Sequence, residues 1–215
     1  MKDEFVMGID NGGTVTKAAI YDSSGRAVAR ASKSTVMLTP GEFHTERDIH
    51  ELWAANVGVI KQAIESAGID AAQIKGVAVT GHGNGLYLVD GEGNPVRNGI
   101  ISTDSRAKAW VARWQSDPGF VSEILPKTMQ SIWAGQPVAL LAWLKDNEPQ
   151  ALQNTRHIFM VKDLIRFYLT GEAFLELTDI SGTNLINVRD CCYDDALLEW
   201  WGLEDIRRKI TTFRM

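Results

Sequence analysis

The first third of the chain alternates short apolar runs with turn-forming residues. An apolar run leads up to Asp10, residues 16–22 alternate apolar and polar positions, and residues 27–35 continue this pattern after the segment Asp-Ser-Ser-Gly-Arg. Asp, Ser and Gly are typical of tight turns between strands. The pattern therefore predicts three consecutive strands joined by turns, a β-meander.

After this meander the spacing of apolar positions becomes helical. Apolar side chains recur three and four residues apart between Asp48 and Gly68, and Glu51 follows Asp48 at the spacing of a capping box. The same reasoning predicts helices over residues 105–115, 137–147, 162–171 and 194–203. Residues 74–80 form a β-branched run typical of a buried strand. Strands followed by this alternation indicate the α/β class, with a mixed β-sheet flanked by helices.

Composition and charge argue against several kinds of function. With 45% hydrophobic and 23% charged residues in a length of 215, the chain has enough material for a globular core. The net charge of −5 and the lack of a long Lys/Arg block argue against a nucleic-acid partner. No apolar run reaches signal-peptide or membrane-spanning length, so no membrane is expected and the cytoplasm is the expected compartment.

The cysteines and histidines do not indicate a disulfide framework or a metal site. Cys191 and Cys192 are adjacent, and neighbouring cysteines bond to each other only with strain. We expect reduced thiols that are buried or half-buried. The four His are scattered and no Cys-x-x-Cys occurs, so a structural zinc site has no support.

Residues 7–17, Met-Gly-Ile-Asp-Asn-Gly-Gly-Thr-Val-Thr-Lys, place two glycines directly behind the first strand. Glycine lets backbone N–H groups approach a ligand closely, and successive N–H groups form an anion-binding nest. Thr14 and Thr16 add hydroxyl donors, Lys17 adds a cation, and Asp10 is suited to hold Mg²⁺ through water. The segment predicts a phosphate loop, with a plain Asn-Gly hairpin as an equally weighted alternative.

Two common phosphate motifs are excluded. No Gly-Lys-Ser/Thr follows the glycines as in a Walker A loop, and the predicted strand after them excludes a dinucleotide fingerprint, which needs a helix there. A second glycine-rich segment, residues 80–85, fails the same test because residues 86–90 also resemble a strand. It either presents His82 and Asn84 to a polar ligand or is a turn with surface side chains, and the residues alone slightly favour the turn.

Several blocks of the sequence resemble a known family. Residues 8–25 resemble the first phosphate motif of the actin-like ATPase superfamily, and later blocks resemble the FGGY carbohydrate kinases. These blocks follow the family's order and spacing over nearly the whole chain, and they are residues 45–53, 77–90, 100–107, 137–149, 162–172 and 178–188. The double glycine and the block Pro-Val-Ala-Leu-Leu-Ala-Trp are most similar to L-xylulose kinases. Residues 1–215 are accordingly identified as an FGGY N-terminal domain.

The resemblance implies a ribonuclease H-like fold of the actin-like ATPase type, in a protein that phosphorylates a sugar hydroxyl. ATP and Mg²⁺ would be the cofactors and a ketopentose such as xylulose, or a polyol, the substrate, while a homodimer is left open. Asp10 would correspond to the acid near Mg²⁺. The phosphate loop would consist of Gly12, Gly13, Thr14 and Lys17. The sugar pocket would be lined by His82, Gly83, Asn84, Asp104, Trp133 and Gln136.

The sequence also departs from the family. Residues 81–85 read Gly-His-Gly-Asn-Gly where D-xylulose kinases carry Gln-Met-His-Gly and glycerol kinases Asn-Gln-Arg-Glu. The pocket is therefore expected to suit neither D-xylulose nor glycerol as those enzymes do. Family members are much longer, and their catalytic base is an Asp that would lie beyond Met215. The chain alone is therefore expected to be inactive. A non-catalytic nucleotide- or sugar-binding module of the actin-like superfamily is the alternative function.

Overall fold

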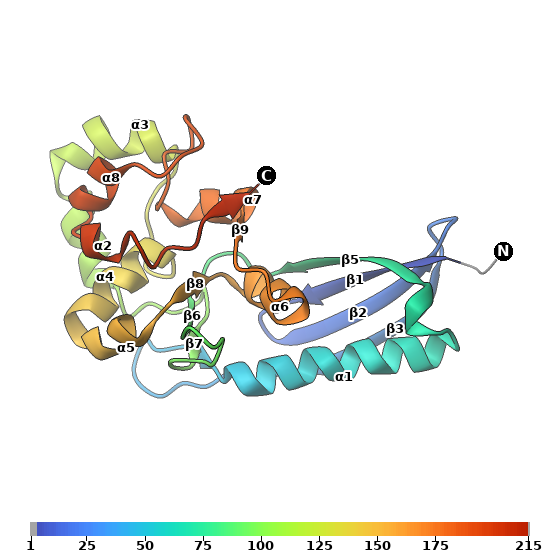
Figure 1. Ribbon diagram of the computed structural model, residues 1–215. Helices are drawn as coiled ribbons and strands as arrows, with labels where there is room; N and C mark the ends of the chain where they lie inside the picture. The colour runs from blue at the N-terminus through green and yellow to red at the C-terminus, as the bar shows by residue number, and fades with distance from the viewer. Residues whose placement is uncertain (1–3, 215) are drawn as a thin grey trace.

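The computed structural model describes residues 4–214 and places the predicted meander in a four-stranded sheet (Figure 1). β1 (Phe5–Asn11), β2 (Val15–Asp22) and β3 (Ala27–Ser34) pair antiparallel, while β5 (Ile74–Gly81) pairs with β1 in parallel. The strand order is β3-β2-β1-β5. The predicted meander and the mixed sheet are both confirmed.

One face of the sheet is covered by α1 (Ile49–Ala67), as Figure 1 shows. The Asp48 carboxylate accepts hydrogen bonds from the amides of His50 (2.7 Å) and Glu51 (3.1 Å), which fixes the start of the helix. Gly68 ends it with a φ of 64°, a left-handed conformation that glycine adopts without strain. The predicted helix is confirmed. The buried apolar cluster between helix and strands consists of Met7, Ile9, Ala18, Ile20, Ala31, Val59 and Ala63.

The prediction of a buried strand over residues 74–80 is correct for the strand and wrong for the burial. Most residues of β5 are exposed, and Val77 keeps 51% of its surface. β5 is an edge strand, because β1 is its only strand neighbour among the described residues, and α6 (Val161–Thr170) contacts it from one side. A β-branched run predicts strand conformation, whereas burial depends on what packs against the strand.

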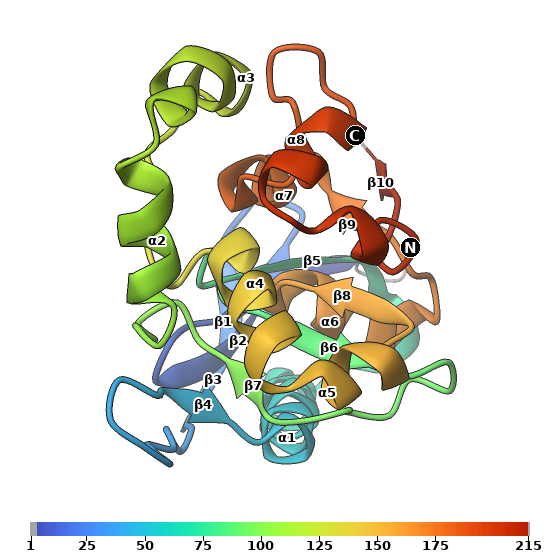
Figure 2. The same cartoon turned by 90° about the vertical axis from the view of Figure 1, so that its left-hand side faces the viewer.

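The rest of the chain builds a larger, mainly helical part around a second apolar core. Short strand pairs connect its segments: β4 (Glu46–Arg47) with β7 (Gly99–Ile100), β6 (Tyr87–Val89) with β8 (His157–Phe159), and β9 (Leu175–Glu176) with β10 (Phe213–Arg214). Besides α6, its helices are α2 (Lys108–Gln115), α3 (Leu125–Thr128), α4 (Pro137–Asn147), α5 (Pro149–Asn154), α7 (Leu177–Ile180) and α8 (Asp195–Trp200). Figure 2 views the molecule with this helical part toward the reader, and there α4 and α5 lie in front of β6 and β8.

The other predicted helices are present with small shifts of their ends. Residues 137–147 coincide with α4, whose first residue is Pro137. The helices α2, α6 and α8 occupy most of the remaining predicted ranges, and Gly171 ends α6 in the left-handed conformation. The single-turn helices and two-residue strands were not predicted, since such short elements carry no periodic signal.

The expectation of buried or half-buried thiols is wrong. Cys191 and Cys192 are free and exposed. They lie in a tight turn, in which Cys191 has a φ of 50° and Cys192 forms an isolated β-bridge with Asn187. Such connecting segments lie on the surface whatever their polarity. None of the helices in the described part of the chain is long and apolar enough to span a bilayer.

Candidate active site

The tip of the β1–β2 hairpin leaves two backbone amides without a partner. The Gly12 amide donates to the Val15 carbonyl (3.0 Å), and the Thr14 carbonyl accepts from the Thr35 amide (3.0 Å). No acceptor within residues 4–214 takes the amide hydrogen of Gly13 or Thr14. A Cβ built on Gly13 would have no heavy atom within 4 Å. The tip therefore offers two neighbouring donors on open space, the arrangement of an anion nest.

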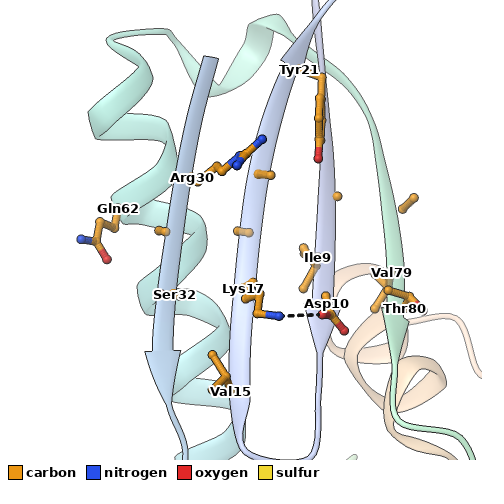
Figure 3. Close-up of a pocket in the computed structure, with 15 residues that line it drawn as sticks. Ile9, Asp10, Val15, Lys17, Tyr21, Arg30, Ser32, Gln62, Val79 and Thr80 are labelled. Atoms are coloured by element: carbon orange, nitrogen blue, oxygen red, sulfur yellow. Dashed lines mark hydrogen bonds and ion pairs between the residues drawn. The ribbon is translucent and has the colours of Figure 1, made fainter. Parts of the chain in front are cut away.

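Asp10 and Lys17 lie next to this tip on the open face of the sheet. They are directly paired across β1 and β2, and the Lys17 Nζ lies 3.5 Å from the Asp10 Oδ2. Figure 3 shows the two side chains pointing toward each other along one wall of a cavity. The cavity has a volume of about 810 Å³, and its walls also include Gly8, Ala19 and Thr80. Both charged side chains are substantially exposed, at 43% and 59%, so both can reach a ligand.

The opposite face of the hairpin is buried. Asn11 and Thr16 pair across the strands, both fully buried, and the Thr16 hydroxyl donates to the Asn11 Oδ1 (3.4 Å). Thr16 is therefore not a ligand donor, contrary to the sequence-based hypothesis. The reason is strand alternation, which directs Thr16 and Lys17 to opposite faces.

Arg47 lies behind the hairpin tip and is a site residue that sequence reasoning missed. Its side chain is completely buried. The guanidinium donates to the Asn11 Oδ1 (3.3 Å), to the Gly12 carbonyl (3.2 Å) and to the Gly13 carbonyl. No local signal identifies it, because an Arg between Glu46 and Asp48 has the pattern of a solvated charged segment.

The loop after β5 begins with His82, which joins the hairpin to the second glycine-rich segment. The His82 amide donates to the Asn11 carbonyl (3.0 Å), and the His82 Nε2 lies 2.8 Å from the hydroxyl of the buried Tyr87. Burial of the ring, together with the nearby Arg47 charge, lowers the pKa of His82 to about 4. The imidazole is therefore neutral at pH 7 and is a polar, uncharged group in this loop.

Asn84 occupies the centre of this loop in a left-handed conformation, with a φ of 59°. Its Oδ1 is buried and has no hydrogen-bond partner. A buried carbonyl oxygen without a donor is costly unless a ligand or water satisfies it. Asn84 is thus the residue of the loop whose hydrogen bonding is least complete, while Gly83 beside it is exposed.

Asp104 lies beneath the loop in a buried network of ion pairs. Its carboxylate accepts from the Thr45 amide (2.6 Å) and from the Arg106 Nε (2.9 Å) and Nη2 (2.8 Å). Arg106 also pairs with Glu46, which in turn binds Arg97. Burial alone would raise the pKa of Glu46, but Arg106 and Arg97 hold it below the usual value. Asp104 therefore has its oxygens occupied by protein donors.

Gln136 is also occupied by protein partners. Its Oε1 accepts from the Trp133 amide (3.1 Å) and from the Asn184 Nδ2 (2.8 Å), and its Nε2 donates to the Gly182 carbonyl (3.0 Å). Its residue exposure is 2%, whereas Trp133 keeps 42% of its surface. Of these two predicted sugar-facing residues, Trp133 has the surface free for contact and Gln136 holds the segment in place.

The structure brings the predicted sugar-facing segments together. The Gly85 amide donates to the Gly135 carbonyl (3.1 Å), and the Leu86 amide donates to the Ile100 carbonyl (2.7 Å). These bonds join residues 82–85 to the Trp133–Gln136 segment and to the strand before Asp104. A Cβ on Gly85 would lie 2.6 Å from the Ile100 carbonyl oxygen, so this close approach requires glycine.

The residues at the hairpin fit a nucleotide phosphate with its magnesium ion. Two free amides and Lys17 suit phosphate oxygens, and one exposed carboxylate suits an ion that keeps most of its water ligands. No group of three or more His, Cys, Asp or Glu side chains that could hold a metal occurs within residues 4–214. A metal here would therefore depend on the phosphates as well as on Asp10.

The meander, the parallel β5 and the glycine hairpin between β1 and β2 define a ribonuclease H-like domain of the actin-like ATPase class. The family model described as "FGGY family of carbohydrate kinases, N-terminal domain" matches residues 5–210. The chain belongs to the FGGY family of carbohydrate kinases, as the sequence blocks predicted.

Individual relatives agree with this assignment. The chain is 39% identical over 206 residues to a protein of Pasteurella multocida named "Probable L-xylulose kinase", covering 96% of this chain and 42% of the relative. It is 36% identical over 207 residues to the L-xylulose/3-keto-L-gulonate kinase of Escherichia coli, with shares of 96% and 41%. The chain thus spans less than half the length of the curated relatives it matches.

Solved structures support the fold. The crystal structure of gluconate kinase from Lactobacillus acidophilus superposes with a TM-score of 0.89 at 24% identity, covering 100% of this chain and 42% of that chain. The crystal structure of Plasmodium falciparum glycerol kinase with ADP gives a TM-score of 0.86 at 17% identity, with shares of 99% and 43%. At these identities the similarity establishes the fold alone.

Proposed function

We propose that the protein containing this domain transfers the terminal phosphate of ATP to a hydroxyl group of a ketopentose such as xylulose. The observation that carries the proposal is the pair of free amides at Gly13 and Thr14, flanked by Asp10 and Lys17 and linked through His82 to a second polar loop. Relatives named as L-xylulose kinases support the substrate class.

In this proposal the chain supplies positioning and charge. The Gly13 and Thr14 amides and Lys17 bind phosphate oxygens, and Asp10 holds Mg²⁺ through water. ATP with its magnesium ion supplies the transferable phosphoryl group, and kinases otherwise depend on positioning and charge neutralisation. His82, neutral at pH 7, and Asn84, with its unpaired oxygen, bind sugar hydroxyls, while Trp133 packs against the sugar.

The residues before Met215 contain no assigned base for the sugar hydroxyl, and we propose that an Asp later in the whole protein supplies it. The domain alone is then expected to bind ligands without turnover. The cytoplasm as its compartment and a homodimer as its assembly stay predictions.

The test is a coupled ADP-release assay of the full-length protein against a panel of ketopentoses and polyols. We expect ATP-dependent turnover with a ketopentose and none with the 215-residue chain. In the Asn84→Ala variant we expect the KM for the sugar to rise at least tenfold, with the KM for MgATP changed less than twofold. Ligand binding without turnover by the full-length protein would instead favour a non-catalytic module.

A further inference from the structure

Arg47 is a buried cation that has no carboxylate partner among the described residues. Its exposed surface is 0%, and no Asp or Glu oxygen of residues 4–214 lies within 4.0 Å of it. Its Nε is buried without a hydrogen-bond acceptor. Burying an unpaired charge costs free energy, so an Arg at this position is expected to have a role that offsets the cost.

The contacts of Arg47 determine the orientation of two peptide groups in the hairpin tip. The guanidinium holds the carbonyl oxygens of Gly12 (3.2 Å) and Gly13. In a trans peptide the C=O and the next N–H point in opposite directions, and every described peptide bond here is trans. Holding these two carbonyls therefore directs the amide hydrogens of Gly13 and Thr14 away from Arg47. These are the two amides that have no hydrogen-bond partner among residues 4–214.

Two backbone hydrogen bonds hold the ends of the hairpin tip, at the Gly12 amide and at the Thr14 carbonyl, but neither involves the two peptide groups that Arg47 binds. Neither Gly13 nor Thr14 belongs to a strand, and a Cβ on Gly13 would meet no neighbour within 4 Å. Glycine peptides rotate freely when nothing holds them. The guanidinium is a rigid planar fork, so it can bind two successive carbonyls in a fixed geometry, which the single ammonium of Lys cannot.

The charge of Arg47, like its hydrogen bonds, favours the binding of an anion at the hairpin tip. An anion at the free amides would provide the negative charge that the described residues do not place beside Arg47, and the low dielectric around a buried group strengthens that attraction. The side chain does not reach the open face itself, because the Gly12–Gly13 backbone lies between.

We infer that Arg47 is a positioning residue for the phosphate site: it fixes two peptide planes so that the Gly13 and Thr14 amides face the terminal phosphate of ATP. The inference rests on the proposed function, because it assumes that a nucleotide phosphate is the anion bound there. It assigns a role to a side chain that does not touch the ligand.

The experiment compares Arg47→Lys and Arg47→Met in the full-length protein with Arg26→Met, which alters an exposed Arg in the β2–β3 turn. We expect the KM for MgATP to rise at least tenfold in Arg47→Met and less in Arg47→Lys, with the KM for the sugar changed less than threefold. Arg26→Met should change neither value. A folded Arg47→Lys variant whose KM for MgATP stays within twofold of wild type would overturn the inference.

A second measurement decides the matter if Arg47→Met fails to fold. In the wild-type protein, NMR amide signals of Gly13 and Thr14 should shift strongly on addition of MgADP or inorganic phosphate, and Arg47→Lys should reduce these shifts. Unshifted Gly13 and Thr14 amides in the wild type would overturn the inference. Amides that shift in the wild type and shift less in Arg47→Lys, in a protein without kinase turnover, would support the role of Arg47 and contradict the proposed function. Failure of the inference and failure of the proposed function are therefore distinguishable.

Discussion

The two sides of the candidate site are built in opposite ways. On the phosphate side, the hairpin presents backbone amides and exposed charges, and its tip residue Gly13 has open space around it. On the sugar side, Asp104 and Gln136 are buried and occupied by other protein groups. The proposed phosphate side thus leaves the Gly13 and Thr14 amides without protein partners, whereas the proposed sugar side uses Asp104 and Gln136 to hold the fold.

The sharpest test of this contrast is Arg106→Met. Arg106 is buried between Asp104 and Glu46, and its removal leaves the buried Asp104 carboxylate without its cation, while Glu46 keeps its pair with Arg97. Breaking a buried pair in this way costs about 3–5 kcal/mol of unfolding free energy. Urea denaturation of the 215-residue chain measures it. The matched control is Lys145→Met, whose exposed pair with Asp205 is worth at most about 1 kcal/mol. Equal losses in both variants would contradict the contrast.

The helical part should also show a pH effect from Asp179. Burial, opposed by Lys162, raises the pKa of Asp179 from 3.8 to about 6. Between pH 4 and pH 6 the unfolded chain releases this proton before the folded chain does, so the carboxyl makes stability fall as pH rises. At 1.36 kcal/mol per pKa unit, wild type should lose about 2 kcal/mol relative to Asp179→Asn across this range. A stability difference between the two proteins that is independent of pH would refute the assignment.

A pair of glycine substitutions compares the two sides directly. A Cβ on Gly135 would lie 2.0 Å from the Ser102 carbonyl oxygen, so Gly135→Ala should destabilise the chain by about 1–3 kcal/mol. Gly13→Ala meets no neighbour and should change stability by less than about 0.5 kcal/mol. In the full-length protein, Gly13→Ala should nevertheless raise the KM for MgATP. Thermal unfolding and steady-state kinetics measure both effects, and a large stability loss in Gly13→Ala would break the comparison.

The smallest effect on stability is expected for Lys17→Met. The Lys17–Asp10 pair is exposed at 3.5 Å, so its loss should change the unfolding free energy by less than about 0.5 kcal/mol. The KM for MgATP of the full-length protein should rise several-fold because a cation near the phosphates is removed. A KM equal to that of wild type would exclude Lys17 from the phosphate site.

The elements that were predicted from sequence are those specified by neighbours along the chain. The meander and the helix after Asp48 follow from alternation, capping and turn residues within a few positions. Strand alternation also contains the information that Thr16 and Lys17 face opposite sides, although Thr16 was interpreted as a ligand donor. The hairpin and its neighbouring loop were likewise singled out from glycine and charge alone.

The remaining features depend on contacts between distant residues. Arg106 binds Glu46 across 60 positions, and Arg47 binds the hairpin across about 35, so neither contact leaves a local pattern. The exposure of β5 depends on what lies beside it, which its own residues do not specify. Sequence reasoning therefore named the segments of the candidate site, including Asp104 and Gln136. It missed Arg47, which binds the hairpin from a distant position, and Arg106, which binds Asp104.

The most direct measurement is a structure of the full-length protein bound to a non-hydrolysable ATP analogue, Mg²⁺ and a ketopentose. We expect phosphate oxygens at hydrogen-bonding distance, about 2.7–3.2 Å, from the amide nitrogens of Gly13 and Thr14. We also expect Arg47 to hold the Gly12 and Gly13 carbonyls in that complex. A nucleotide bound elsewhere, with both amides facing only solvent, would refute the phosphate-binding role of the hairpin.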